Sequence, residues 1–241
     1  KLQTSFPEGF ILRGCSEDFA NLLKSRKGEA FLLGKSATIN LSTFQPKKSL
    51  QILAQRGIRE SYIQELPVSN SSRKIIEKLW TQSKYFRVPR LRYLFQDPGA
   101  LSQRIFCLAS NEPLAAVCIS RLAEESWHLE VLIRDKRAPV GSMESLILWV
   151  CNKLYVEGFA TFSLGEVPFL PDNSIKGRSS SLFELSISAA ARAVLKGRFN
   201  IQGLYSFKDK FTPHWEPVFW CGWPKISLID LAWIGLHSKA I

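Results

Sequence analysis

The fold is decided by residues 104–134, which read RIFCLASNEPLAAVCISRLAEESWHLEVLIR. Two short segments, 110–113 and 123–125, divide this stretch into three largely apolar runs. Each run has the length and the aliphatic or aromatic content of a strand, and each dividing segment has the composition of a turn. We therefore predict three antiparallel strands, at Arg104–Ala109, Leu114–Arg121 and Trp127–Arg134.

A helix and a fourth strand are predicted after these three strands. Beyond a loop at 135–140, apolar residues recur at helical spacing until Gly158, and 160–164 again has the composition of a strand. This order of elements is that of the GCN5-related acyltransferase fold, in which the loop before the helix presents backbone N–H groups to an anionic cofactor. Residues 137–142 hold that position. Their glycine spacing differs by one residue and Pro139 lacks an N–H, which argues against acetyl-coenzyme A.

The rest of the chain supplies further helices and strands, so the predicted fold class is α/β. Turn residues and apolar periodicity define these elements. The predicted helices are 16–27, opened by Ser16; 46–55, opened by Pro46 and ended by Gly57; 73–86, capped by Ser71 or Ser72; and 181–196. The predicted strands are 30–33, 38–41, 59–66 and 218–220.

The composition points to a basic globular protein. The chain has 241 residues, 46% of them hydrophobic, and a net charge of +11. Such a charge favours nucleic acid, anionic lipid or another polyanion as a partner, although solubility alone can also explain it. No run approaches the roughly 20 apolar residues of a membrane span, and no signal peptide is visible. The chain starts at Lys1 and has a single methionine, Met143, which is compatible with a fragment of a longer protein.

The cysteines and histidines show no metal-site spacing. Five scattered cysteines lack a C-x-x-C pair, and the chain has three histidines. We therefore expect reduced cysteines, a cytoplasmic location and no bound metal.

Residues 203–217, GLYSFKDKFTPHWEP, combine cations with aromatic residues and prolines. If this segment is extended, Lys208 and Lys210 leave one face and Phe207 and Phe211 leave the other. The result is a cationic surface that suits a phosphate or a carboxylate. The alternative is an edge strand whose lysines are simply solvated.

Several strings resemble the C-terminal catalytic domain of bacterial phosphatidylglycerol lysyltransferases and alanyltransferases, the multiple peptide resistance factor family. Each is similar to a family pattern: A-P-x-G-T-M-D-F-L-F, G-x-x-x-F-N-L-G-M-A-P-L, G-L-x-x-F-K-x-K-F-x-P-x-W-E-P-R-Y and, more weakly, I-D-L-M-R. The matching strings are APVGSMESLI (138–147), GFATFSLGEVPF (158–169), GLYSFKDKFTPHWEP (203–217) and LEVLIR (129–134).

The resemblance implies two tandem GCN5-related acyltransferase-like lobes with mixed central sheets flanked by helices. We place a shortened lobe at 1–98 and the lobe that carries the site at 99–241. The resemblance also implies transfer of an amino acid from aminoacyl-tRNA, a co-substrate, to a hydroxyl of a phosphatidylglycerol-like anionic lipid. No other cofactor is implied, and the usual location is the cytoplasmic face of the membrane, with peripheral contact. The oligomeric state stays open.

Two departures from the family pattern affect the candidate site. An alignment without a gap puts the acid of I-D-L-M-R on Glu130 but its arginine on Ile133. One inserted gap restores Arg134 but puts Val131 at the acid, and the sequence does not decide between these alignments. Val218 replaces the arginine that follows W-E-P.

Acyl transfer needs a carboxylate for the substrate amine or a proton, and positive charge for the oxyanion and phosphates. The candidate catalytic residues are Glu130, Arg134 and Lys208. The candidate substrate-binding residues are Lys210, Glu144, Gly165, Glu166, Trp215 and Glu216. Structural alternatives are an ion pair of Glu130 with Arg134 or Arg137, a helix-dipole role for Glu144, a turn role for Glu166 and a core role for Trp215.

Two further segments have ambiguous character. Arg87, Arg90 and Arg92 alternate with aromatic residues, as in surfaces that bind single-stranded nucleic acid, but a hinge with solvated arginines fits equally. Residues 226–241 could lie on a membrane interface or finish the core as a helix. The alternative functions are a coenzyme A-dependent N-acyltransferase and a non-catalytic relative that binds tRNA or anionic membrane.

Overall fold

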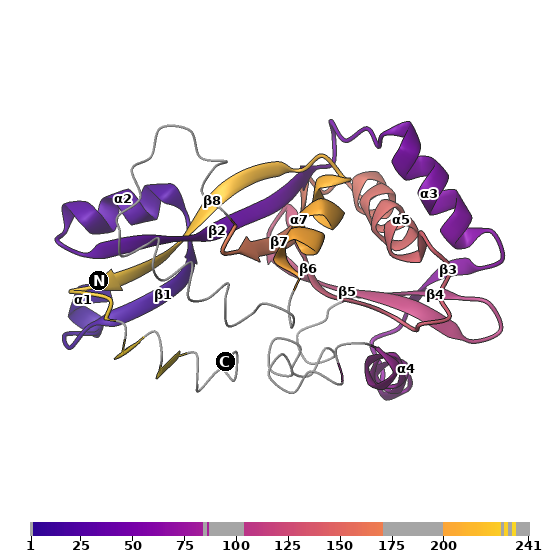
Figure 1. Ribbon diagram of the computed structural model, residues 1–241, viewed down its shortest axis with the longest axis horizontal. Helices are drawn as coiled ribbons and strands as arrows, with labels where there is room; N and C mark the ends of the chain where they lie inside the picture. The colour runs from indigo at the N-terminus through magenta and orange to yellow at the C-terminus, as the bar shows by residue number, and fades with distance from the viewer. Residues whose placement is uncertain are drawn as a thin grey trace. The chain divides into compact units, whose positions relative to one another are not determined.

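The computed structural model describes residues 2–83, 86, 104–170, 200–227, 229–230 and 233–234 (Figure 1). Its strands form one eight-stranded mixed sheet in the order β1-β8-β2-β7-β6-β5-β4-β3. The strands are β1 Phe10–Cys15, β2 Glu29–Asn40, β3 Tyr62–Leu66, β4 Arg104–Ala109, β5 Pro113–Ala123, β6 Ser126–Arg134, β7 Thr161–Pro168 and β8 His214–Trp223. The helices are α1 Leu2–Ser5, α2 Glu17–Ser25, α3 Lys48–Ile58, α4 Asn70–Gln82, α5 Ser142–Val156 and α7 Ile201–Asp209.

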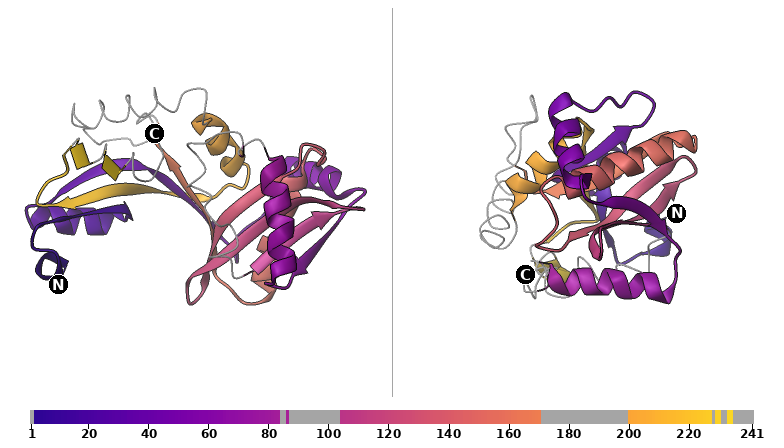
Figure 2. Two further views of the ribbon diagram at one scale, coloured as in Figure 1. Left: turned by 90° about the horizontal axis from the view of Figure 1, so that it is seen from below. Right: turned by 90° about the vertical axis from the view of Figure 1, so that its right-hand side faces the viewer.

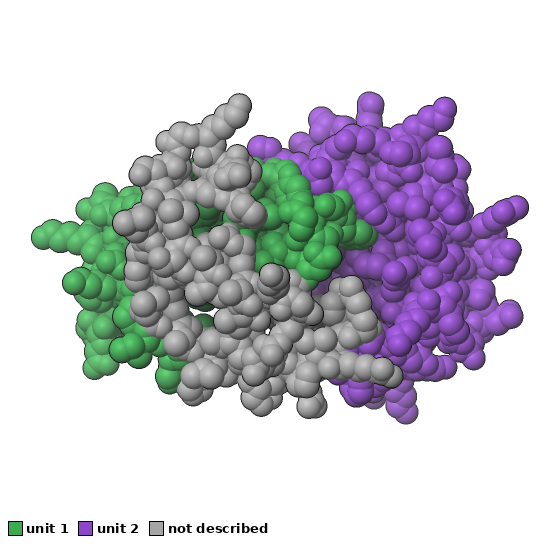
Figure 3. Space-filling model, in the orientation of Figure 1, with its two compact units in different colours: residues 1–37, 166–207, 215–241 green, residues 38–165, 208–214 purple. Residues whose placement is uncertain are grey.

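The predicted α/β class and acyltransferase order are confirmed. Strands β4, β5 and β6 pair antiparallel, α5 follows, and β7 then pairs parallel to β6. Contacts divide the chain into two compact units, which alternate along the sequence (Figure 3). The first unit contains 1–37, 166–207 and 215–241, and the second contains 38–165 and 208–214. A tandem pair of lobes divided at 98/99 stays a prediction, because these two residues lie outside the described ranges.

In the second unit, helices cover both faces of the strands (Figure 2). Alternate residues of each strand point to opposite faces. Ile105 therefore packs toward α4, in a buried cluster with Ile76 and Leu79, while its neighbour Phe106 contacts Trp149 of α5 at 5.2 Å between ring centroids. This double covering explains why β4 and the middle of β5 are almost continuously apolar.

Arg104 joins three elements at one end of this unit. Its guanidinium donates to Glu65 on β3, at 2.7 Å from Nε, and to Glu157 just after α5, at 2.5 Å from Nη1. The hydrogen bonds to Glu65, aided by those to Glu157, raise the pKa of Arg104. Since the side chain is 14% exposed, the pairing holds a largely buried charge.

The first unit is built on β1, β8 and the start of β2. Ser16 caps α2 as predicted, its hydroxyl accepting from the N–H of Phe19 at 3.3 Å. The helix then buries Ala20 and Leu23 against Phe219 and neighbouring apolar residues.

Several predicted boundaries were wrong. The two short strands expected at 30–33 and 38–41 are one strand, β2, and Gly34 lies inside it. A Cβ on Gly34 would lie 2.2 Å from the carbonyl oxygen of Val167, so this glycine permits a close backbone approach rather than a turn. Strands β3 and β8 also differ in extent from the predicted 59–66 and 218–220.

Two helix termini also differ from prediction. The cap of α4 is Ser69, whose hydroxyl accepts from the N–H of Ser72, rather than Ser71 or Ser72. Gly57 does not end α3 but lies buried within it. The helix predicted at 181–196 lies outside the described residues. No helix in the described part of the chain is long and apolar enough to cross a membrane.

Candidate active site

The segment expected to be an extended cationic surface is instead the end of a helix. The Oδ1 atom of Asn200 accepts from the N–H of Gly203 at 2.7 Å, as an N-cap does, and α7 runs on to Asp209. Residues two apart in a helix point to nearly opposite sides. Lys208 is therefore buried, at 5% exposure, whereas Lys210 is exposed. The prediction that both lysines share one face was wrong.

Strands β6 and β7 separate at the point where Lys208 approaches them. Their parallel pairing joins 126–128 to 161–163 and stops at His128 and Ser163, although β6 runs on to Arg134 and β7 to Pro168. Side chains at the carboxyl ends of parallel strands are well placed to meet a ligand. The parting of these two strands is therefore our candidate site in the second unit.

Polar side chains converge at this parting. The Nδ1 atom of His128 and the Oγ atom of Ser163 lie 3.2 Å apart, and Oγ accepts from the N–H of Gly165 at 3.1 Å. A Cβ on Gly165 would lie 3.3 Å from Cε1 of His128 and 3.6 Å from Nζ of Lys208. Gly165 adopts a φ of +80°, which favours glycine. An imidazole and an ammonium group therefore meet over a residue that has no side chain.

Glu130 enters the same region through a β-bulge. Leu129 pairs with Ile119 and Val131 with Cys118, so β6 has one more residue than β5 at this point, and that residue is Glu130. The Glu130 carboxylate accepts a short hydrogen bond from the hydroxyl of Ser120. Ser120 is also the residue of β5 that stands opposite His128 of β6 in the sheet. Among the described residues, Glu130 forms no ion pair with Arg134 or Arg137, so that structural alternative was wrong.

The bulge does not decide between the two alignments. If Glu130 is the inserted residue, Arg134 keeps the arginine position and Val131 takes the acid position, as in the gapped alignment. If Glu130 is the acid, the arginine position falls on Ile133. Arg134 is exposed and pairs with Ala115 at the end of β6, about 13 Å along an extended strand from Glu130.

Lys210 and Glu144 form an ion pair. The Nζ atom of Lys210 donates to Oε1 of Glu144 at 2.8 Å, and the carboxylate is largely buried in the first turn of α5. Glu144 therefore does more than interact with the helix dipole, because it fixes the segment that follows α7.

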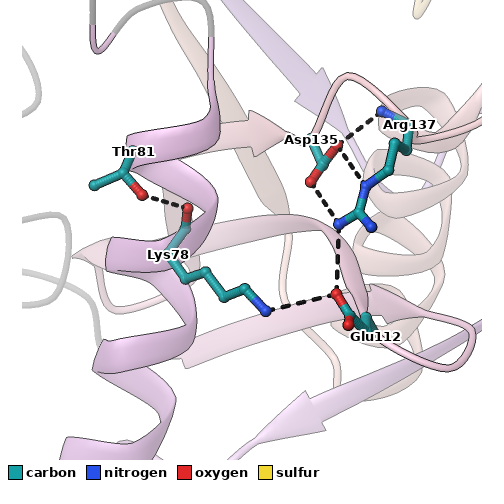
Figure 4. Close-up of polar contacts among 5 residues, drawn as sticks. All are labelled: Lys78, Thr81, Glu112, Asp135 and Arg137. Carbon is teal, nitrogen blue, oxygen red and sulfur yellow. Dashed lines mark hydrogen bonds and ion pairs between the residues drawn. The ribbon is translucent and has the colours of Figure 1, made fainter.

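The loop before α5 uses its N–H groups internally (Figure 4). The N–H of Arg137 donates to Oδ1 of Asp135 at 2.8 Å, and that of Ala138 to the Asp135 carbonyl at 3.2 Å. The Arg137 guanidinium also donates to Asp135 at 2.9 Å, and these hydrogen bonds lower the pKa of the buried Asp135 carboxyl. Glu112 and Lys78 extend the network across the surface.

Helix α3 covers the N-terminus of α5. A Cβ on Gly57 would lie 2.2 Å from the carbonyl carbon of Gly141 and 2.4 Å from the nitrogen of Ser142. The hydroxyl of Ser145 donates to the Ala54 carbonyl of α3 at 2.5 Å. The backbone of α3 therefore packs directly against the first turn of α5.

The remaining predicted site residues lie in other surroundings. Glu166 follows Gly165 and forms an ion pair with Arg13 at 2.8 Å. Trp215 is half-buried and stacks on Tyr205 at 4.9 Å between centroids, while Glu216 is exposed on β8. Arg87, Arg90 and Arg92 lie outside the described residues.

Sequence reasoning missed three polar residues of the region: His128, Ser163 and Ser120. The signal was present, because a histidine and a serine stand at corresponding places in two strands that the fold makes parallel neighbours. The sequence did not reveal the register between these strands, which brings the two residues together.

Comparison with known proteins identifies the family. Residues 5–222 match the family model described as phosphatidylglycerol lysyltransferase, C-terminal. The chain belongs to this family. Its resemblance to that family, inferred from four short strings, is therefore confirmed, and membership indicates a transferase. The comparison with curated protein sequences returned no match.

Solved structures share the fold. The structure of L-PGS from Bacillus licheniformis superposes with a TM-score of 0.70 at 19% identity, covering 99% of this chain and 75% of that one. The C-terminal domain of a putative lysylphosphatidylglycerol synthetase from Agrobacterium fabrum gives 0.69 at 21% identity, covering 96% of this chain and 73% of that one. A conserved protein of unknown function from Bacteroides thetaiotaomicron gives 0.60 at 12% identity, covering 92% and 72%.

Proposed function

We propose that this protein transfers an amino acid from aminoacyl-tRNA to a hydroxyl of an anionic, phosphatidylglycerol-like lipid. Family membership supports transfer to lipid, and the group at the parting of β6 and β7 supports acyl chemistry. The observation that carries the proposal is the convergence of Lys208 and His128 on Gly165. This convergence brings an ammonium group and an imidazole, a ring able to transfer a proton, to a residue that has no side chain.

The reaction exchanges one ester for another. The lipid hydroxyl attacks the aminoacyl carbonyl, the bond to the ribose oxygen breaks, and the hydroxyl proton passes to that ribose oxygen. The protein therefore needs a group that moves a proton and a positive charge that stabilises the oxyanion. We assign proton transfer to His128, held by Ser163, and oxyanion stabilisation to Lys208.

We assign the other candidates to substrate binding. The Glu130 carboxylate, held by Ser120, binds the ammonium group of the amino acid. Because Arg134 lies at the exposed end of β6, it suits a phosphate of the tRNA or the lipid better than the reacting carbonyl. Lys210 and Glu144 hold the segment that carries Lys208. Gly165 adds no side chain beside His128 and Lys208. Glu166, Trp215 and Glu216, which belong to the first unit, stay candidates for substrate binding.

The position of α3 argues against a coenzyme A donor. In acyltransferases of this fold, a pyrophosphate is bound by amides at the start of the helix after the fourth strand. Here Pro139 lacks an N–H, Asp135 accepts two of the loop N–H groups, and α3 lies against Gly141. An aminoacyl ester on tRNA needs no such loop.

The net charge of +11 is consistent with both proposed partners, because tRNA is a polyanion and the lipid has a negatively charged headgroup. We place the reaction at the cytoplasmic face of a membrane, with the protein in peripheral contact. Arg87, Arg90 and Arg92 remain candidates for contact with the tRNA.

The test is transfer of radiolabelled amino acid from charged tRNA into vesicles that contain phosphatidylglycerol, with phosphatidylcholine vesicles as the comparison. We expect label in the anionic lipid. Lys208→Met should reduce the rate about 100-fold or more, because one oxyanion donor typically contributes that much. Glu130→Gln should chiefly raise the KM for the charged tRNA.

Matched controls are Lys74→Met and Glu60→Gln, because both side chains are exposed and neither forms an ion pair with a described residue. Circular dichroism checks that each variant is folded. Transfer that is unaffected by Lys208→Met would contradict the assigned site. Binding of tRNA or vesicles without any transfer would instead indicate a non-catalytic relative.

A further inference from the structure

A cavity of about 420 Å³ is lined by the connection from β2 to α3 and by the turn between α7 and β8. Its lining residues come from two segments, 39–45 and 212–214, and both segments belong to the second unit. The volume falls within the roughly 300–1,000 Å³ typical of small-molecule sites. None of the candidate residues discussed above lines this cavity.

The lining is polar and aromatic. Asn40, Thr43, Gln45 and Thr212 supply amide and hydroxyl groups, and Phe44 and His214 supply rings. No lysine, arginine, aspartate or glutamate is among the described lining residues. A phosphate or carboxylate would require a cation, and an acyl chain would require a mostly apolar wall. The lining instead suits a neutral planar group with hydrogen-bonding edges.

Several of these polar groups are available to a ligand. The side chains of Thr43, Gln45 and Thr212 make no hydrogen bond to any other part of the described chain. The Oδ1 atom of Asn40 accepts from the N–H and the hydroxyl of Ser42, at 3.1 and 2.8 Å. These bonds fix the Asn40 amide and leave its Nδ2 group to donate elsewhere.

Cations flank the first lining segment without entering the cavity. Lys47 and Lys48 follow Gln45 closely and are exposed. Lys210 precedes Thr212 by two residues but is paired with Glu144. A neutral ring inside the cavity and a negatively charged chain outside it would match this distribution. Single-stranded nucleic acid has this combination of a base with a neutral edge and a charged backbone.

We propose that the cavity binds an unpaired nucleobase near the single-stranded end of an RNA. Phe44 stacks on the base, Asn40 and Gln45 bond to its edge, and Lys47 and Lys48 meet the adjoining phosphates. This inference rests on the proposed function, in which the amino acid is carried at the unpaired 3′ end of a tRNA. The cavity then anchors a base close to the end that delivers the amino acid.

The experiment measures binding of a labelled RNA hairpin with a four-nucleotide 3′ overhang by fluorescence anisotropy, at fixed salt. In a parallel series each overhang base is replaced in turn by an abasic residue, which keeps the phosphate charge. We expect one abasic position to weaken wild-type binding about tenfold, the scale of one lost base-aromatic stack. Phe44→Leu and Gln45→Ala should bind the intact hairpin about fivefold to tenfold more weakly and no longer distinguish it from that abasic form.

The matched control is Gln55→Ala, because Gln55 is an exposed glutamine of α3 without a side-chain partner among the described residues. It should bind like the wild type. Gln45 is itself exposed, so Gln45→Ala tests the cavity without disturbing the core.

The outcomes separate this proposal from the proposed function. Hairpin binding that is equal across the abasic series, or unchanged by both cavity variants, overturns the nucleobase site and leaves the donor assignment intact. Absence of any hairpin binding overturns both. Phosphatidylglycerol vesicles that lose affinity for Phe44→Leu while RNA binding is unchanged identify a lipid occupant and also overturn the nucleobase site.

Discussion

Gly165 has a backbone conformation and a neighbourhood that a side chain would disturb. Its φ is +80°, and a Cβ would press on His128 at 3.3 Å. Gly158 offers a matched comparison, with a φ of +85° and nothing within 4 Å of a Cβ. Both alanine variants should lose about 1–2 kcal/mol of unfolding free energy, because both force alanine into the left-handed region.

The two variants should differ in activity. Gly165→Ala should reduce amino acid transfer at least tenfold, whereas Gly158→Ala should transfer like the wild type once both are assayed below their melting temperatures. Chemical denaturation and the lipid-labelling assay measure the two quantities separately. Equal activity of the two variants would show that the space over Gly165 has no part in the reaction.

The candidate site was partly predictable at the residue scale. Glu130 and Lys208 stand out by their residue type and by the family pattern, and the structure places each beside other polar groups. The bulge at Glu130 was not predictable, because a bulge shows no composition of its own. His128 was passed over because a single histidine within a strand gives no indication of its neighbour across the sheet.

At the scale of elements, the loop before α5 depends on one carboxylate. Hydrogen bonds from Arg137 lower the pKa of Asp135, so the folded state binds a proton there less readily than the unfolded state. The stabilisation is therefore present above the ordinary aspartate pKa of about 4 and is lost as the pH falls through the lowered value.

Asp135→Asn should lower the unfolding free energy at pH 7 by about 2 kcal/mol, because hydrogen bonds to a charged acceptor are lost. Its stability should then change less than that of the wild type between about pH 5 and pH 2. Urea unfolding across this range measures both effects. Glu60→Gln is the control, and a variant whose acid sensitivity equals that of the wild type would argue against the Asp135 network.

The elements themselves differed in how well they could be predicted. The hairpins β4–β5 and β5–β6 follow from turns between apolar runs, and α2 follows from Ser16. The end of α7 was misjudged because, in an extended segment, Lys208 and Lys210 would leave one face and Phe207 and Phe211 the other. The signal that was overlooked is Asn200, which caps the helix several residues before the lysines.

At the scale of the whole molecule, the net charge of +11 should govern association with polyanions. Raising the salt concentration from about 50 to 200 mM should weaken binding of the RNA hairpin at least tenfold, since counterions released from the RNA must then be displaced into a saltier solution. A peptide nucleic acid strand of the same sequence has no backbone charge and serves as the comparison. An RNA affinity that does not change with salt concentration would show that the net charge serves only solubility.

The contact between Gly57 and Gly141 also limits which residues these two positions can accept. Alanine at position 57 would place a methyl group 2.2 Å from backbone atoms of Gly141, and alanine at 141 would meet the Leu53 carbonyl at 1.9 Å. A substitution at either position therefore requires α3 and α5 to move apart. The close contact thus fixes how near α3 and α5 lie to one another at this point.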